Sequence, residues 1–289
     1  MGIKMNTNYN KSQLKVLDPK SAKLVRELYS QNIKFFGLKE ILKITGLTTT
    51  SAHKLISRMI HRGVLNRLKS GFYNLVPFEL GEERFYFGNP YIIAREFVKK
   101  TAKKSASDDY YISHGSAMQI HQMVTQPQLI IYASVRNRIL PQNIMGTDFH
   151  FVLCKKNHLF GYNNFWIEKS EKIFVSDIEK TILDGLKMPQ YCGGIIEVAK
   201  AMWIKRNDLN IDKILNYARR LNVGAVYRRL GFLLEVFAIN HRGVESLRKK
   251  ISNTYQLLDP TLPKEGKHNS KWRLQINVSK DELTEITRT

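Results

Sequence analysis

The stretch LKEILKITGLTTTSAHKLISRMIHRGVLNRLKSGFYNLV, residues 38–76, decides the fold of the N-terminal part of the chain. Within it, residues 50–62 carry apolar side chains three and four positions apart, a spacing that places them on one face of a helix. These apolar residues are Ala52, Leu55, Ile56, Met59 and Ile60. Threonines at 48–50 offer hydroxyl N-caps, Gly63 suits the C-terminal end, and a shorter helix over 38–44 ends before Gly46. The pattern predicts two helices joined by a tight turn.

The opposite face of the second helix is polar and basic. It presents Ser51, Lys54, Ser57, Arg58 and His61, with Arg62 at its rim. Two β-prone runs follow, at 64–68 and 72–76, on either side of Lys69-Ser70-Gly71, and this is a hairpin signal. A helix-turn-helix followed directly by a hairpin is typical of a winged helix. We therefore predict a winged helix-turn-helix that contacts nucleic acid.

The predicted DNA contacts lie on the second helix and on the hairpin. They are Thr50, Ser51, Lys54, Ser57, Arg58, His61, Arg62, Arg67 and Lys69. An ordinary surface helix also has one apolar and one solvated basic face, and some winged helices contact only proteins. The order of helix, turn, helix and hairpin, with cations on both the helix and the tip, favours nucleic acid.

The length of 289 residues predicts two domains. We expect a flexible tail over 1–17, the winged helix-turn-helix over 18–77, a linker over 78–89 and a larger C-terminal domain over 90–289. The C-terminal domain mixes strands and helices without strict alternation, so the predicted class is α+β. Its predicted helices cover 90–104, 115–123, 178–186, 194–206, 211–221, 224–239 and 243–251, and its predicted strands cover 109–112, 128–134, 148–154, 164–167, 172–175, 255–258 and 272–278.

The chain is strongly basic, with 46 Lys and Arg against 25 Asp and Glu, a formal charge of +21. Residues 1–80 hold 14 of these cations and 4 of the carboxylates, so the basic character is densest around the predicted winged helix. Such an excess favours binding to polyanions. It does not distinguish DNA from RNA.

Cysteine usage and hydropathy predict a cytoplasmic protein without a membrane partner. The only cysteines, Cys154 and Cys192, have no CxxC or zinc spacing and are expected to be reduced. The first residues are polar, unlike a signal peptide, and no apolar run approaches the ~20 residues of a membrane helix. No cofactor is indicated.

No constellation in the C-terminal domain predicts catalysis. Asp177, Glu179 and Asp184 resemble a metal-binding nuclease cluster, but Ser176 and Glu179 also form a capping box at a helix start. The pair His114 and His121, the dipeptide Gly193-Gly194 and the isolated Ser116 are weak signals as well. The prediction is therefore no catalytic residue, no metal and no enzyme.

Two arginine pairs form a candidate functional surface in the C-terminal domain. Arg219-Arg220 ends one predicted helix, and Arg228-Arg229 lies inside the next. They could clamp phosphates or partner carboxylates, or they could simply border the apolar core.

Five stretches give the chain a resemblance to a known family. They are RGVLNRLKSGFYNL (62–75), YYISHGSAMQIHQM (110–123), VSDIEKTILDGLKMPQYCGG (175–194), VYRRLGFLLE (226–235) and YQLLDPTLPKEGKHNSKWRLQINV (255–278). In this order and spacing they resemble the AbiEi family, antitoxin-repressors of type IV abortive-infection toxin–antitoxin systems. The resemblance implies a DNA-binding domain that represses its own operon, through an inverted repeat in its promoter. It also implies a C-terminal antitoxin domain that counteracts a nucleotidyltransferase toxin without a stable complex.

Two other functions remain open at this point. The protein could be an RNA-binding or tRNA-interacting module, because net charge does not separate the two nucleic acids. It could also be a nuclease fused to a winged helix, which would require the carboxylates around Asp184 to hold a metal.

Overall fold

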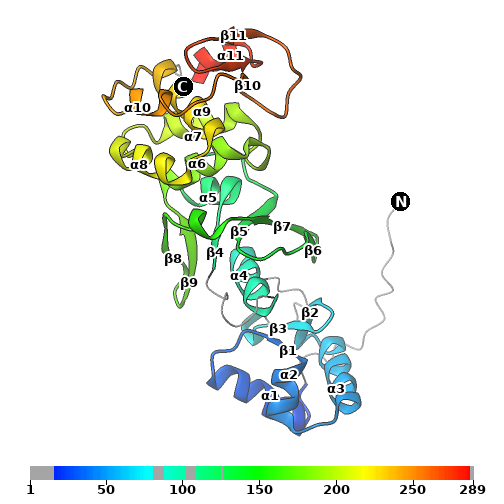
Figure 1. Cartoon of the computed structure of the whole chain (residues 1–289). Coiled ribbons are helices and arrows are strands. Elements are labelled where there is room, and N and C mark those ends of the chain that lie inside the picture. Colours follow the sequence, from blue (N-terminus) through cyan, green and yellow to red (C-terminus); the bar gives the residue numbers. More distant parts are fainter. Residues whose placement is uncertain (1–15, 81–87, 102–108, 125, 287–289) are drawn as a thin grey trace. The chain divides into compact units, whose positions relative to one another are not determined.

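The computed structural model describes residues 16–80, 88–101, 109–124 and 126–286, which form a mixed α+β fold (Figure 1). The chain separates into two compact units. The N-terminal unit ends at Ile93 and includes Ile144–Gly146, and the C-terminal unit comprises Ala94–Asn143 and Thr147–Thr289. The predicted tail over 1–17 and the linker over 78–89 fall mostly outside the described residues. Of the linker, Phe78–Leu80 forms one 3-10 turn.

The N-terminal unit combines helices with a small antiparallel sheet. Its elements are α1 (Pro19–Ser30), β1 (Phe35–Gly37), α2 (Leu38–Thr45), α3 (Thr49–His61), β2 (Leu65–Lys69) and β3 (Phe72–Leu75). The strand order is β1-β3-β2, with both pairings antiparallel. The predicted hairpin is confirmed, whereas β1 was not predicted. Its three residues are too few to show an alternating pattern, and it forms only by pairing with β3.

Helix α3 follows the predicted pattern. Thr48 is the N-cap and its hydroxyl accepts a hydrogen bond from the Ser51 amide, while Gly46 ends α2 in the left-handed conformation. Four of the five predicted apolar residues, Ala52, Leu55, Ile56 and Met59, are at most 1% exposed, and Ile60 is partly buried. They pack with residues of α1 and α2, including Leu24, Leu28 and Ile41. Burial of this face fixes which side chains of α3 remain in solvent.

A six-stranded mixed sheet forms one layer of the C-terminal unit. Its strands are β4 (Tyr110–Ile112), β5 (Ile130–Val135), β6 (Gln142–Ile144), β7 (Thr147–Leu153), β8 (Tyr162–Glu168) and β9 (Glu171–Ser176). They lie in the order β6-β7-β5-β4-β9-β8, with β5–β7 and β4–β9 parallel and β4–β5 and β8–β9 antiparallel.

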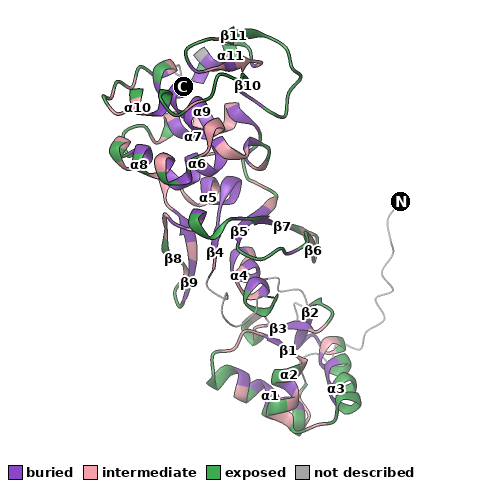
Figure 2. Cartoon of the chain, viewed as in Figure 1, coloured by how far each residue is buried: buried purple, intermediate pink, exposed green. Residues whose placement is uncertain are grey.

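Helices gather beside this sheet, followed by a second, three-stranded sheet (Figure 1). The helices are α4 (Pro90–Thr101), α5 (His114–Ile120), α6 (Ile178–Lys187), α7 (Ile195–Ile204), α8 (Ile211–Leu221), α9 (Gly224–Val236), α10 (Glu245–Arg248) and α11 (Lys280–Glu285). The small sheet has the order β10-β12-β11, from Gln256–Leu257, Leu274–Ile276 and Lys267–Asn269. Helix α6 packs against α5, α7, α8 and α9, and every residue from 179 to 186 is buried (Figure 2).

Several predicted boundaries were wrong. Helix α10 is much shorter than the predicted 243–251, and β12 is shorter than 272–278. The predicted capping box is also wrong: Asp177, not Ser176, is the N-cap of α6 and accepts from the Lys180 amide at 2.8 Å. Ser176 stays in β9, fully buried, with its hydroxyl 2.7 Å from that of Thr181. Glu179 instead accepts from the Asn210 amide, 3.0 Å away.

The buried face of α6 contains a charged pair. Lys180 is 0% exposed, and its ammonium donates to the Asp184 carboxylate one turn later and to the Tyr111 hydroxyl at 2.6 Å. The Tyr111 hydroxyl donates to Asp184 at 2.9 Å. Burial, and then the negative charge of Asp184, raise the pKa of Tyr111 well above its usual value, so this hydroxyl remains a donor. The rings of Tyr111 and Phe160 lie 4.9 and 5.4 Å from the ammonium. The three polar groups satisfy one another within the core.

Removing one member of this pair is expected to lower the free energy of unfolding. The Asp184→Asn protein should lose about 3–5 kcal/mol of unfolding free energy, because Lys180 would keep a buried charge without its partner. The double variant Lys180→Met with Asp184→Leu should recover most of this loss. Chemical denaturation of the three proteins measures the effect. A double variant as unstable as Asp184→Asn would contradict this account.

Candidate nucleic-acid interface

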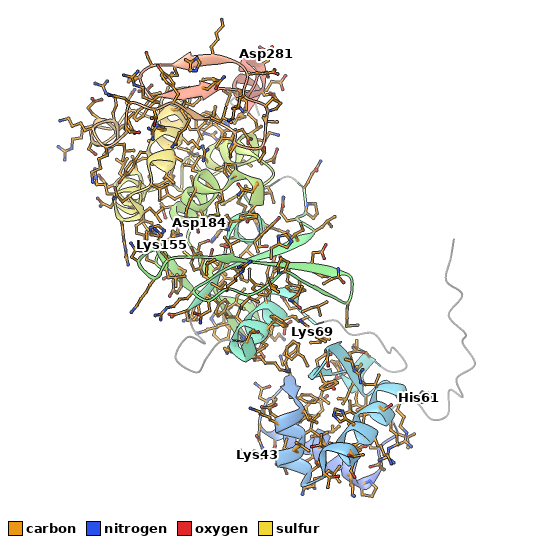
Figure 3. All side chains as sticks on the ribbon, turned by 45° about the vertical axis from the view of Figure 1, so that its right-hand side comes forward. Lys43, His61, Lys69, Lys155, Asp184 and Asp281 are labelled. Carbon is orange, nitrogen blue, oxygen red and sulfur yellow. The ribbon has the colours of Figure 1, made fainter. Side chains whose placement is uncertain are left out.

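The solvent face of α3 is polar and cationic, as its sequence spacing predicted. Ser51, Lys54, Ser57, Arg58 and His61 are all exposed, and so is Thr50 in the first turn. His53 is also exposed on this helix and was not among the predicted contacts. Figure 3 labels His61 on α3 with Lys43 of α2 and Lys69 of β2 in the same unit. The structure thus places the predicted α3 residues together on one face.

Two arginines of α3 also contact the start of α1. The Asp18 carboxylate lies 3.7 Å from Arg58 Nη2 and 3.7 Å from Arg62 Nη1, and Arg62 donates to the Val16 carbonyl at 3.2 Å. The side chain of Arg58 is 56% exposed and that of Arg62 only 28%. Arg62 therefore helps to hold α3 against α1, whereas Arg58 remains largely in solvent. Sequence reasoning missed Asp18, because nothing local links it to residues forty positions later.

Asp18 is at the same time the N-cap of α1. Its carboxylate accepts from the Ser21 amide at 2.9 Å. That hydrogen bond is the largest influence on its pKa, which is lowered below the usual value of 3.8, although partial burial opposes the shift. The Ser21 hydroxyl and the charges of Arg58 and Arg62 lower it further. At neutral pH, the α3 face therefore includes one fixed negative charge among its cations.

Both predicted cations of the hairpin are exposed to solvent. Arg67 and Lys69 are exposed, and the guanidinium of Arg67 lies 5.9 Å from the ring centre of Tyr73 on β3. The strand register shifts between Arg67 and Lys69. Gly71 follows with φ of +66° at the turn and open space around it. A left-handed residue here allows the chain to reverse within the hairpin.

The arginines of the predicted C-terminal surface do not lie on one exposed face, so this prediction was wrong. Arg228 and Arg229 are 1% and 4% exposed, because residues 226–234 of α9 are all buried and leave no solvent face there. Arg220 is exposed, with its guanidinium 4.0 Å over the Phe160 ring. Arg219 donates to Asn216 at 2.6 Å and to Ser246 at 3.0 Å.

The buried arginines bind main-chain and hydroxyl oxygens. Arg228 donates to the Ser252 carbonyl and hydroxyl and to the Thr254 carbonyl, at 2.9 to 3.1 Å. Arg229 donates to the carbonyls of Leu186 at 2.6 Å and Leu257 at 3.1 Å. Burial lowers the pKa of Arg229 to about 10, so it remains charged at neutral pH.

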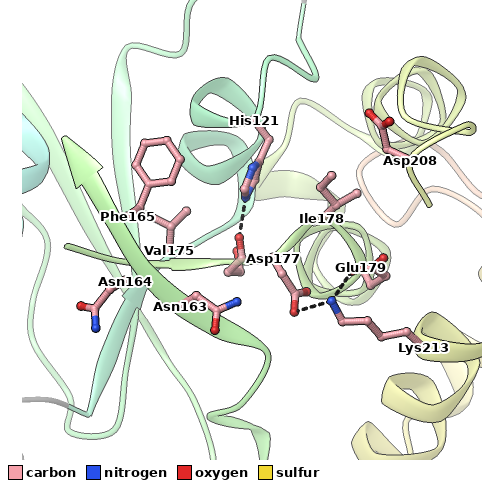
Figure 4. A pocket seen from close by; sticks show the side chains of 11 residues that line it. His121, Asn163, Asn164, Phe165, Val175, Asp177, Ile178, Glu179, Asp208 and Lys213 are labelled. Carbon is pink, nitrogen blue, oxygen red and sulfur yellow. Dashed lines mark hydrogen bonds and ion pairs between the residues drawn. The ribbon is translucent and has the colours of Figure 1, made fainter. Parts of the chain in front are cut away.

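The carboxylates of the nuclease alternative are separated in the structure. Asp177 and Glu179 line a pocket of about 380 Å³, where Lys213 lies 3.1 and 2.8 Å from them (Figure 4). Burial lowers the pKa of Lys213, but the hydrogen bonds of both carboxylates outweigh it and raise the pKa to about 12. Asp184 does not line this pocket, since it pairs with Lys180 in the core. Within the described residues, no three His, Cys, Asp or Glu side chains are grouped to hold a metal.

The weaker catalytic signals have structural explanations. His114 is buried, and burial lowers its pKa to about 4, so the ring is neutral. Ser116 accepts from the Tyr132 amide at 2.8 Å and donates to the Ile130 carbonyl. His121 forms a hydrogen bond to the Ser176 carbonyl, with 2.6 Å between Nε2 and the oxygen. Gly194 precedes α7, whose first amide donates to Asp259, so a protein carboxylate already occupies this helix start.

Both cysteines, Cys154 and Cys192, are buried and form no disulfide. Across the described ranges, each helix is too short or too polar to cross a membrane.

No family model matches the chain, and no curated protein matches it. Among solved structures, the chain is similar to the RV2827C protein from Mycobacterium tuberculosis, with a TM-score of 0.66 and 11% sequence identity. The match covers 95% of this chain and 96% of that chain. At this identity the likeness concerns the fold alone, over nearly the full length of both chains.

Asp18 is expected to titrate below its ordinary pKa of 3.8. Because its folded-state pKa is lowered, the ionised group stabilises the N-terminal unit above the unfolded-state pKa, and this stabilisation is lost as the pH falls through the folded-state value. An NMR titration of the Asp18 carboxyl measures the midpoint directly. The Arg62→Gln variant should move it part of the way back towards 3.8, because the hydrogen bond from the Ser21 amide persists. A wild-type midpoint at or above 3.8 would exclude the cap and ion-pair geometry.

Proposed function

We propose that the N-terminal unit is a winged helix-turn-helix that binds double-stranded DNA and that the protein represses its own operon. The observation that carries this proposal is the solvent face of α3, which collects hydroxyl and cationic side chains while its other face is buried. The order α2, turn, α3 and hairpin β2–β3 supports it, because this arrangement places a helix in the major groove and a hairpin beside it.

The parts of this surface are suited to different contacts on DNA. Arg58 lies mid-stripe between Lys54 and His61 and is largely exposed, so its planar guanidinium can take guanine O6 and N7 together. Lys69 on the hairpin is suited to phosphate, which carries no sequence information. Lys39 and Lys43, both exposed on α2, add cations that can follow the flanking backbone.

The antitoxin activity is the second part of the proposal, and it rests on the resemblance to the AbiEi family. We infer that the C-terminal unit counteracts a nucleotidyltransferase toxin encoded in the same operon, without a stable complex. The division of the chain into two units supports separate roles for DNA binding and antitoxin activity. A nucleotidyltransferase gene next to this one, and rescue of growth by the full chain, would test this part.

An RNA-binding module is the alternative that the same surface permits, because a basic helix face also attracts RNA. Duplex DNA carrying the upstream sequence and a structured RNA, compared at equal salt, discriminate between the two. The proposal requires tighter binding to the upstream DNA than to either random DNA or RNA.

The protein is expected to protect an inverted repeat upstream of its own gene, because one such unit reads a short half-site. If about six phosphates are contacted per unit, the logarithm of affinity should fall with the logarithm of salt concentration with a slope of about −5. Footprinting measures the protected sequence, and titrations at several salt concentrations measure the slope. Protection of a single unrepeated half-site, or a slope near zero, would contradict DNA binding through this face.

Three variants separate the contributions of the interface. Arg58→Ala should cost about 1–3 kcal/mol on the operator and relax preference at one base pair. Lys69→Ala should weaken operator and random DNA alike and reduce the salt slope by about one. Asp18→Asn should strengthen binding, because Asn also caps a helix while the negative charge beside Arg58 and Arg62 is removed.

Operator and random-sequence affinities, measured with thermal unfolding, are the readouts for these variants. Lys155→Gln, which removes an exposed cation of the C-terminal unit, is the control and should leave DNA affinity unchanged. An unchanged ratio of operator to random affinity in folded Arg58→Ala would mean that Arg58 does not read a base.

A further inference from the structure

Helix α9 contains a buried cation that lacks an anionic partner. Arg229 is 4% exposed, yet it forms no ion pair within the described residues, and its hydrogen bonds go to two main-chain carbonyls. Its Nε is buried without a hydrogen-bond partner. Buried charges are normally paired, as Lys180 is with Asp184 in the same unit. Arg228, 1% exposed, likewise forms no ion pair within the described residues, but it does not line the pocket described below. Arg229 does line that pocket, where a ligand can reach it.

The protein carboxylate whose charge acts on Arg229 already accepts other hydrogen bonds. Asp259 is buried and its charge acts on Arg229, but its oxygens accept from the Ile195 amide at 2.7 Å and from the amide and hydroxyl of Thr261 at 2.8 and 2.6 Å. These bonds hold it at the start of α7. It does not form an ion pair with Arg229.

Arg229 lines an open pocket of about 790 Å³, formed by residues of α6, α9 and the segment around β10. Two further cations line it, Lys187 at the last turn of α6 and Lys264, together with the polar side chains of Gln190, Tyr255 and Thr261. None of the lining residues is Asp or Glu. Lys187 and Lys264 form no ion pair within the described part of the chain, so three cations line this pocket and none of them is paired with a carboxylate there.

We propose that this pocket binds a small ligand that bears a phosphate or pyrophosphate group. Its volume lies within the range of small-molecule sites, and three lining cations with several neutral donors suit a group of high negative charge. Lys187 and Lys264 supply two further charges from the pocket lining, and Arg229, held by two main-chain carbonyls, supplies a fixed one. The site belongs to the C-terminal unit and is independent of DNA binding by α3.

Calorimetric titration of the full-length protein at low salt tests the site, with inorganic pyrophosphate and ATP as separate probes. We expect saturable binding of pyrophosphate. The double variant Lys187→Gln with Lys264→Gln should weaken it at least about tenfold, since two charge-assisted contacts are lost. Comparable binding of ATP would show that the pocket also admits a nucleoside, and binding of pyrophosphate alone would assign recognition to the phosphates. Both results support a phosphate site.

Two matched variants control for net charge. Lys155→Gln with Lys156→Gln removes two exposed cations of the same unit, and Lys54→Gln with Arg58→Gln removes two from α3. Both should retain binding and, like wild type, unfold at higher temperature when pyrophosphate is added. The NMR signal of the Arg229 Nε–H should also shift on titration. The proposal would be overturned if pyrophosphate did not bind saturably or if the Arg229 signal did not move. It would also be overturned if all three double variants weakened binding equally, or if only the α3 variant lost it.

Discussion

Burial of α6 is the constraint on which the C-terminal unit depends. Four helices cover it, so any charge on it must be satisfied without water, and Lys180 meets this condition through Asp184 and Tyr111. At the C-terminal end of this helix, the Leu186 carbonyl accepts a hydrogen bond from Arg229, and Lys187 lines the open pocket. The packing that buries Lys180 thus also brings Lys187 and Arg229 to the lining of one pocket.

The N-terminal unit depends on the corresponding burial of one face of α3. Because its apolar residues pack against α1 and α2, the helix cannot rotate without exposing them, and its cationic face is held in solvent. Asp18 links this face to α1 by capping one helix and contacting two arginines of the other. The Asp18 carboxylate holds α1 against α3, and it also offsets part of the positive charge of the α3 face. Its negative charge therefore stabilises the unit but weakens the attraction of this face for anions.

Local patterns predicted much of the fold, and long-range contacts account for most of the errors. The apolar spacing of α3, its threonine cap and the hairpin around Gly71 involve residues within a few positions of one another, and the sequence predicted them correctly. Strand β1 and the contacts of Asp18 require partners about forty positions away, which no local pattern reveals. The Arg228-Arg229 pair illustrates the limit, because consecutive arginines indicate a surface, whereas the helices and loops that cover α9 come from distant sequence.

The two cationic sites of the chain differ in how their charges are solvated, and this difference bears on what each can recognise. Lys54, Arg58, Arg67 and Lys69 are exposed on α3 and the hairpin, so their attraction for an anion is screened by salt. Arg229 has already lost its water and keeps a charge that carbonyl dipoles only partly compensate. An anion placed beside it interacts through a medium of lower effective permittivity, so a compact group of high charge gains more there than a neutral one. The total charge of +21 therefore does not by itself distinguish these sites, whereas the burial of Arg229 does.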